Sequence, residues 1–195
     1  MGMETVDTEA LDKADMERLA QGHDAGLNAL MERHAGPLFQ FLLRMLGDEQ
    51  DANDLSQETF VRVYRHRERF DGSKFTTWLY TIASNLARNE YRRRARHPVV
   101  SLHAENPGAE GSLEDTLPAA DSGPRTAAEL QEQQEAVRAA VQQLPDDLRE
   151  ALILCEWQEM SAAEAATILQ TTSRAIESRL YRARRLLRDQ LKRWL

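Results

Sequence analysis

The chain of 195 residues has few of the features on which enzymes, metalloproteins and disulfide-bonded proteins depend. Its only cysteine, Cys155, excludes an intramolecular disulfide. A buried core thiol is the first interpretation of Cys155, and a redox sensor is the alternative. The five histidines show no metal-ligand spacing with Cys155 or with each other. Because nucleophile elbows and phosphate-binding glycine loops are also missing, we expect no catalytic activity, no metal and no cofactor.

Long hydrophobic runs are missing as well. The first residues are acidic and contain no apolar stretch of the kind that a signal peptide needs. No run in the sequence approaches the length of a membrane span. The sequence therefore predicts a cytoplasmic protein without membrane insertion.

Acidic residues outnumber basic residues overall, and the basic residues are unevenly distributed along the chain. The formal net charge is −7. Residues 1–17 hold six acidic residues and one basic residue, and residues 98–136 hold eight acidic residues and one basic residue. The basic residues concentrate in residues 88–96 and near the C-terminus. Because binding responds to local potential, this asymmetry is compatible with a nucleic-acid partner.

Proline and glycine mark the organisation of the chain. Four of the six prolines and three of the nine glycines fall between residues 98 and 124, among acidic residues and few aliphatics. Such a segment buries too little apolar surface to fold alone, which predicts a flexible acidic linker at 98–126. Helical signals dominate on both sides and strand-like alternation is nearly absent. We expect an all-α fold with helical domains at 21–97 and 127–195, after an acidic N-terminal extension at 1–20 that is either disordered or regulatory.

The helices of the first domain follow from apolar spacing. A strongly apolar helix ends at Gly47, and a second one is expected from about Asp51 to His66. A third begins near Phe75 and cannot extend far past Pro98. Its inward-facing residues are Trp78, Leu79, Ile82, Ala83 and Leu86.

The last third of the chain has the pattern of a helix-turn-helix. Ser161 and Glu164 have the spacing of a capping box at the start of a short helix. A turn at residues 170–172 then leads into a basic helix, where residues 174–194 hold eight basic and two acidic residues. Its inward stripe is Ile176, Leu180, Ala183 and Leu187. An ordinary solvated helix with an arginine bias is the alternative, but cap, turn and charge together favour a DNA-binding helix in the major groove.

Two segments of the first domain and most of the second resemble a known family. Asp51–Phe60 and Phe70–Leu79 resemble the second conserved region of bacterial sigma factors, and Leu144–Arg188 resembles their fourth region. The extracytoplasmic-function (ECF) group, group 4 of the sigma-70 family, is the most similar. The resemblance covers about residues 20–97 and 130–190. It implies a subunit that directs core RNA polymerase to promoter DNA, nucleates melting, and is commonly held inactive by an anti-sigma factor.

The resemblance also assigns a polymerase-binding surface. It implies that one stripe of the second helix docks on the clamp helices of the largest polymerase subunit, while the flap is a second contact. The residues at the matching positions are Asp51, Asp54, Gln57 and Glu58. Their chemistry suits pairing with basic residues, although a plainly solvated face is the alternative that the residues alone leave open. The linker likewise is either a plain tether or an RNA-like acidic segment.

For the promoter minus-10 element, the resemblance points to the 68–74 loop and the third helix, which would capture an extruded base. Asn85 matches the position that hydrogen-bonds this base, while Lys74, Arg88 and Arg92 are placed to hold phosphates. Trp78 is either a core residue or a stacking platform. The predicted minus-10 residues are thus Lys74, Trp78, Asn85, Arg88 and Arg92.

For the minus-35 element, the resemblance points to the basic helix of the helix-turn-helix. The predicted contact residues are Thr172, Ser173, Arg174, Glu177, Ser178, Tyr181 and Arg182. The chain departs from the family where glycine is common in the turn and a Gly-Thr pair opens the helix, because it has Gln170 and Arg174-Ala175 there. Gln170 is therefore predicted to adopt a left-handed conformation at a cost of about 1 kcal/mol.

A second hypothesis is a helix-turn-helix transcriptional regulator that binds duplex DNA without docking on polymerase. The discriminating feature is the 51–74 segment, which such a regulator would not need.

Overall fold

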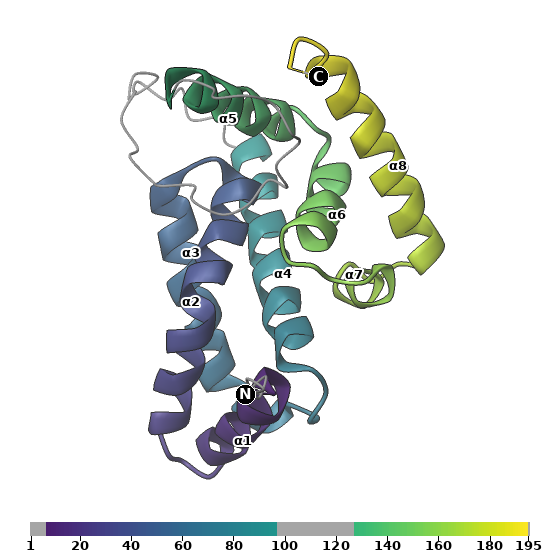
Figure 1. Cartoon of the computed structure of the whole chain (residues 1–195). Helices are drawn as coiled ribbons and strands as arrows, with labels where there is room; N and C mark the ends of the chain where they lie inside the picture. The colour runs from purple at the N-terminus through teal and green to yellow at the C-terminus, as the bar shows by residue number, and fades with distance from the viewer. Residues whose placement is uncertain (1–6, 97–126, 195) are drawn as a thin grey trace, which may run out of the picture.

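The computed structural model describes residues 7–96 and 127–194, and every regular element in these ranges is a helix (Figure 1). The all-α prediction is therefore confirmed. The predicted linker lies outside the described residues. Within the described ranges, no helix is both long enough and apolar enough to cross a membrane.

The first domain is built from four α-helices and one short 3₁₀ turn. α2, α3 and α4 pack side by side, and α1 lies across one end of them (Figure 1). The elements are α1 (Thr8–Ala20), α2 (Ala25–Leu46), α3 (Glu49–Arg65), η1 (Arg67–Arg69) and α4 (Phe75–Arg96). The helix predicted from Asp51 to His66 is α3, whose two ends lie within two residues of those positions. The helix predicted to begin near Phe75 is α4, which begins at that residue.

The apolar helix that ends at Gly47 is longer than its sequence pattern suggested. It begins at Ala25 and continues through Pro37, although proline cannot donate the backbone hydrogen bond of a helix interior. Leu38, Phe41 and Met45 are fully buried and hold the helix in the core. Gly47 ends it in a left-handed conformation with φ of 72°, and its N–H donates to the Leu43 carbonyl at 2.9 Å.

The acidic N-terminal extension contains a packed helix. On α1, the carboxylates of Asp12 and Asp15 are buried against α2. Arg33 donates to Asp12 Oδ1 at 2.9 Å and to Asp15 Oδ2 at 2.6 Å, and His34 Nε2 lies 2.8 Å from Asp12 Oδ2. These acids looked like surface charges in the sequence because their partners lie 18 to 22 residues further along the chain. Residues 8–20 therefore belong to the body of the first domain.

The second domain consists of α5 (Ala127–Gln142), α6 (Asp146–Glu156), α7 (Ala162–Ile168) and α8 (Ser173–Gln190). Both partners of the predicted capping box form their hydrogen bonds: Ser161 Oγ accepts from the Glu164 N–H, and Glu164 accepts from the Ser161 N–H. Ile176, Leu180 and Ala183 are buried against α6 and α7, while Leu187 is half-buried. The helix-turn-helix is thus confirmed as a structure.

The second domain packs on the first. α5 and α6 contact α2, and α7 contacts α4, so α4 faces the helix-turn-helix (Figure 1). The apolar residues of both domains form one continuous core cluster. Cys155 is half-buried and packs against this cluster, where burial raises the pKa of its thiol.

Candidate nucleic-acid and polymerase interfaces

The outer face of α8 brings together all of the residues predicted for the minus-35 element. Every one of the seven side chains is exposed: Thr172, Ser173, Arg174, Glu177, Ser178, Tyr181 and Arg182. They lie opposite the buried stripe of α8 because they recur at spacings of three and four residues. Tyr181 is 70% exposed, so it contributes almost nothing to the core. This face displays hydroxyl and guanidinium donors, which are groups that can bond to base edges and phosphates.

The start of α8 is held in place by backbone geometry. Thr172 Oγ1 accepts from the Ala175 N–H at 3.2 Å and caps the helix. Gln170 has a φ of 51°, which confirms the left-handed conformation predicted for it. A second residue, Glu159, adopts a φ of 52° before α7, and no feature of the sequence indicated this. The two strained positions bracket the short helix α7.

Basic residues on the flank of α8 are attached to α6. Arg179 Nε lies 3.5 Å from an Asp147 carboxylate oxygen, and Arg182 Nη2 lies 4.0 Å from the same oxygen. Arg184 pairs with Glu156 at 2.5 Å. Arg182 therefore lies at the edge of the outer face, next to α6, and Arg174, Arg185 and Arg188 are exposed further along the helix.

The residues predicted for the minus-10 element lie on one side of α4 and differ in their exposure. Arg92 is exposed, and Asn85 is half-buried, accepting from Arg88 Nη1 at 3.4 Å. Trp78 is half-buried in a cluster with Phe70 and Phe75, at ring-centroid distances of 5.3 and 6.3 Å. The packing of Trp78 favours the interpretation as a core residue.

Two of the predicted phosphate-binding side chains are paired with carboxylates of the second domain. Lys74 Nζ lies 2.6 Å from Glu164 Oε1, and Arg88 Nε lies 3.1 Å from Glu150 Oε2. The hydrogen bond from Lys74 and those from Ser161 lower the pKa of Glu164 to about 2. Burial raises the pKa of Glu150, and Arg88 opposes this rise. Sequence reasoning missed both pairs because their members lie 90 and 62 residues apart.

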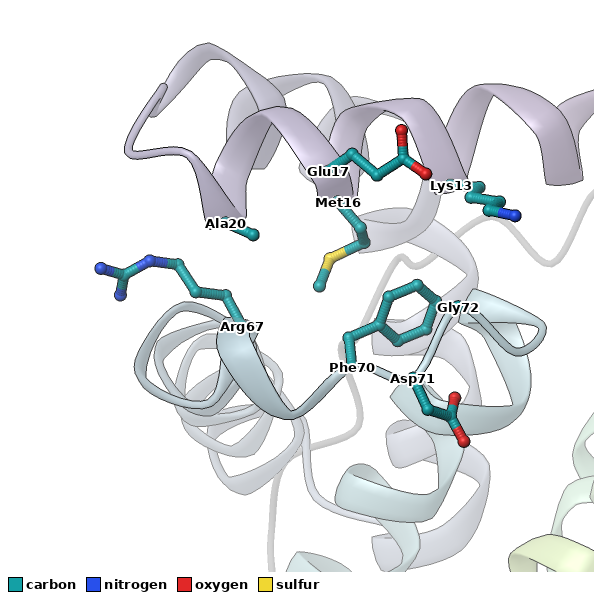
Figure 2. Close-up of a pocket in the computed structure, with 8 residues that line it drawn as sticks. All are labelled: Lys13, Met16, Glu17, Ala20, Arg67, Phe70, Asp71 and Gly72. Atoms are coloured by element: carbon teal, nitrogen blue, oxygen red, sulfur yellow. The ribbon is translucent and has the colours of Figure 1, made fainter.

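A cavity of about 310 Å³ opens beside the 68–74 loop, between α1 and η1 (Figure 2). Phe70 and Met16 give it an apolar floor, while charged groups stand at its rim. Asp71 accepts from the Ser73 N–H at 2.9 Å, and Gly72 has a φ of 79°, so the loop forms a defined turn. The lining residues are Lys13, Met16, Glu17, Ala20, Arg67, Phe70, Asp71 and Gly72.

The predicted polymerase-binding residues share α3 but are not equally available. Asp54 and Gln57 are exposed. Asp51 is half-buried and pairs with Arg94 of α4. Glu58 is half-buried and accepts from Arg62 of the same helix at 2.9 Å. Val61 and Tyr64, each 40% exposed, extend this face by one turn.

The described residues contain no group of three or more histidine, cysteine or carboxylate side chains that could hold a metal ion. The predicted binding residues form three surfaces, which are the outer face of α8, one side of α4, and the exposed turn of α3.

Comparisons with known proteins show the family of the chain. Residues 30–97 match Sigma-70 region 2, and residues 134–187 match Sigma-70, region 4. The chain is 34% identical over 182 residues to the RNA polymerase sigma-H factor of Pseudomonas aeruginosa, covering 91% of this chain and 92% of that protein. It is 31% identical to the ECF RNA polymerase sigma factor SigW of Bacillus subtilis, covering 94% of this chain and 98% of that protein.

Solved structures agree with the sequence relatives. The fold is similar to that of CnrH in complex with the cytosolic domain of CnrY, with a TM-score of 0.68, 26% identity and coverage of 93% and 97% of the two chains. It is also similar to the sigma factor RpoE bound to the anti-sigma factor NepR from Bartonella quintana, with a TM-score of 0.63, 26% identity and coverage of 85% and 96%. With both regions matched in order and relatives covered over nearly their whole length, the chain belongs to the ECF group of the sigma-70 family.

Proposed function

We propose that this sigma factor directs core RNA polymerase to promoters with two elements and nucleates their melting, without catalytic activity of its own. One observation carries the proposal: both sigma regions are present in order, and each displays cationic side chains on one helix. We assign the promoter- and polymerase-binding functions to residues 21–97 and 127–195, while residues 8–20 pack on the first of these units as α1. Because it acts with polymerase on the promoter, we place the protein in the cytoplasm.

In this proposal the outer face of α8 reads the minus-35 element. Ser178, Tyr181 and Arg182 contact base edges, and the exposed arginines of the helix hold phosphates. Glu177 is acidic at a DNA-facing position. A carboxylate there repels phosphate but accepts a hydrogen bond from the amino group of cytosine.

The first domain supplies the minus-10 contacts and the melting step. Lys74, Arg88 and Arg92 hold the backbone of the separated strand, while Asn85 bonds an extruded base. The cavity beside the 68–74 loop lies apart from Asn85, which is not among its lining residues. Its aromatic floor offers a surface for stacking.

The exposed turn of α3 is the proposed polymerase contact. Asp54 and Gln57 are the side chains of the predicted set that stand exposed, so we expect them to carry most of the contact with the clamp helices. We further propose an anti-sigma partner. CnrH and RpoE are similar in fold, and each was solved in a complex, CnrH with the cytosolic domain of CnrY and RpoE with the anti-sigma factor NepR.

Reconstituted transcription tests the proposal. The full-length protein and bacterial core polymerase are combined with a library of randomised promoters, and the transcripts are sequenced. We expect initiation from templates that share two spaced elements. Asp54→Ala with Gln57→Ala should abolish these transcripts while leaving duplex DNA binding by α8 intact.

A negative result in this assay is also informative. One such result is that no promoter-dependent transcript appears, while the protein alone binds a duplex operator tightly and does not associate with core polymerase. The protein would then be a helix-turn-helix regulator that acts without docking on polymerase. Loss of core association and of transcription in the α3 variant, with duplex DNA binding retained, would separate polymerase docking from DNA binding.

A further inference from the structure

α1 carries buried charges and lies beside the loop that we assign to the minus-10 element. We propose that α1 positions the 68–74 loop, and that the ion pairs of Asp12 and Asp15 with α2 fix α1 at the place from which it holds this loop. In this role neither carboxylate touches DNA, so both are positioning residues. The link to minus-10 binding rests on the proposed function, whereas the contacts between α1 and the loop do not.

A single guanidinium joins two turns of α1 to α2. Arg33 Nε donates to Asp12 Oδ1 at 2.9 Å, and Arg33 Nη2 donates to Asp15 Oδ2 at 2.6 Å. Arg18 Nη1 donates to the other oxygen of Asp15 at 3.0 Å. Because a guanidinium is planar and rigid, its bonds to two turns fix both the rotation of α1 about its axis and its position along α2. Apolar packing alone has no direction and would permit shifts that these bonds exclude.

The backbones of α1 and α2 also meet directly. A Cβ added at Gly26 would lie 2.3 Å from the Asp15 carbonyl oxygen and 3.1 Å from the Leu19 nitrogen. This approach is too close for any side chain, and Leu19 is fully buried beside it. The ion pairs of Asp12 lie about one turn before this crossing. Two separate points of contact thus prevent α1 from pivoting on α2.

α1 holds the loop through Met16 and Lys13. Met16 is buried and points toward Phe70 (Figure 2). Lys13 Cε lies 3.9 Å from the position that a Cβ on Gly72 would take, so the stem of this lysine lies beside the turn of the loop. The cavity of about 310 Å³ next to Phe70 leaves its ring room to shift. The place of Phe70 therefore depends on where α1 holds Met16.

His34 is a second connection between the ion pairs and the loop. Its Nε2 lies 2.8 Å from Asp12 Oδ2, and its ring centroid lies 5.1 Å from that of Phe75 at the start of α4. The Phe75 ring lies 6.3 Å from Phe70 and 6.3 Å from Trp78. The aromatic rings at both ends of the loop thus pack next to an imidazole whose orientation the Asp12 carboxylate fixes.

Few bonds within the loop hold its shape. The Ser73 N–H donates to Asp71 at 2.9 Å, and the Trp78 N–H donates to the Lys74 carbonyl at 3.3 Å. Residues 71–74 are all exposed. When α1 is displaced, the loop is free to take other conformations, and only the fraction of molecules in the competent one binds DNA tightly. Anchoring α1 therefore raises the affinity for the minus-10 strand without a contact to it.

Arg33→Lys in the full chain tests this inference, because lysine keeps the charge and loses the two-pronged contact. Hydrogen exchange in the free protein, followed by NMR, measures opening of the loop. The reporting amides are those of Phe70, Ser73 and Trp78, each of which donates a hydrogen bond in or beside the loop. We expect their exchange to become about tenfold faster, because local opening of the loop becomes more frequent.

The matched control is Leu42→Ala. Leu42 is fully buried and lies two turns beyond His34 on α2, so this variant lowers the overall stability at a distance from the ion pairs. Amides that exchange through local opening do not respond to overall stability. Exchange from the loop should therefore stay at the rate of the parent in Leu42→Ala.

DNA binding is measured with the holoenzyme. The probe is a fluorescein-labelled single strand that carries the minus-10 sequence of the most active promoter from the randomised library. Arg33→Lys should weaken this binding about three- to tenfold, since fewer molecules hold the competent loop. The affinities for core polymerase and for a duplex minus-35 element should stay at the level of the parent. A role of α1 in stability alone would leave all three affinities unchanged wherever the protein is folded.

Two results would overturn the inference. One is loop exchange in Arg33→Lys that equals that of Leu42→Ala, and the other is faster loop exchange with no loss of minus-10 binding. Should Arg33→Lys fail to fold, His34→Gln takes its place, because glutamine keeps a donor for Asp12 and removes the ring that contacts Phe75. Because hydrogen exchange involves neither polymerase nor promoter, a failure of the positioning role is distinguishable from a failure of the sigma function.

Discussion

Replacing each of two glycines of α2 by alanine should change the stability in opposite directions. A Cβ added at Gly26 would lie 2.3 Å from the Asp15 carbonyl oxygen, where α1 crosses α2, whereas a Cβ at Gly36 would meet nothing within 4 Å. Gly26→Ala should therefore lower the free energy of unfolding by about 1–3 kcal/mol through overpacking. Gly36→Ala should raise it by about 0.5–1 kcal/mol, because alanine favours the helix. Urea unfolding of both variants measures this, and equal effects would show that α1 does not pack there in solution.

Arg182 is expected to contribute one phosphate or base contact from the outer face of α8. Arg182→Ala should weaken binding to duplex promoter DNA and lower the slope of log affinity against log salt by about 1. Arg193→Ala is the control, because Arg193 is also exposed but lies past the end of α8 and near Glu132 at 3.4 Å. Fluorescence anisotropy over a range of salt concentrations gives both slopes. Equal slopes for the two variants would place the DNA elsewhere.

At the scale of elements, apolar periodicity predicted most of what is seen. α3, α4 and α8 follow their patterns because each buries one stripe along its length. The packed helix α1 did not follow from the sequence, since its buried faces include Asp12 and Asp15, which are acceptable inside only with Arg33 and His34 beside them. The start of α2 was missed because Pro37 and the small residues before it hide the pattern.

The titration of Glu164 reports whether α7 meets Lys74 in solution. The pKa of Glu164 is lowered to about 2, first by Lys74 and then by Ser161. A carboxylate with a lowered pKa in the folded state adds stability above its ordinary pKa of about 4.5, and this stability is lost as the pH falls toward 2. Lys74→Met should raise the pKa of Glu164 part of the way back toward 4.5.

Carboxyl carbon NMR measures this titration directly. Ser161→Ala is the companion variant, because it removes the cap and keeps the lysine, and it should raise the pKa by a smaller step. An unchanged titration in Lys74→Met would mean that the two domains do not meet at α7 when the protein is in solution.

At the scale of the whole molecule, the sequence predicted two domains but not their contact. Each side chain in that contact had a sufficient local explanation: Glu164 caps α7, Glu150 continues α6, and Arg88 belongs to the basic end of α4. Complementarity between them appears only when α4 and α6 are placed together, and the paired residues are 62 to 104 positions apart. Two of the acidic residues that contribute to the net negative charge, Glu164 and Glu150, pair with Lys74 and Arg88, which are cations that we predict to bind DNA.

We expect Arg149 to couple the unfolding of the two domains. Its guanidinium donates to the carbonyls of Met45 in the first domain and Leu144 in the second, and to the Tyr91 hydroxyl. Burial raises the pKa of Tyr91 to about 12, so this hydroxyl remains protonated and can donate onward to the Met45 carbonyl. Arg149→Ala leaves buried acceptors without donors and should cost about 2–3 kcal/mol.

Calorimetry distinguishes this cost from a simple loss of stability. The parent should unfold in one main transition because each domain supports the other, and Arg149→Ala should split it into two, with the lower one belonging to the less stable domain. Arg138→Ala on the exposed side of α5 removes the same charge and should leave a single transition. A single, merely shifted transition in Arg149→Ala would mean that the continuous apolar core, and not the polar contact, couples the domains.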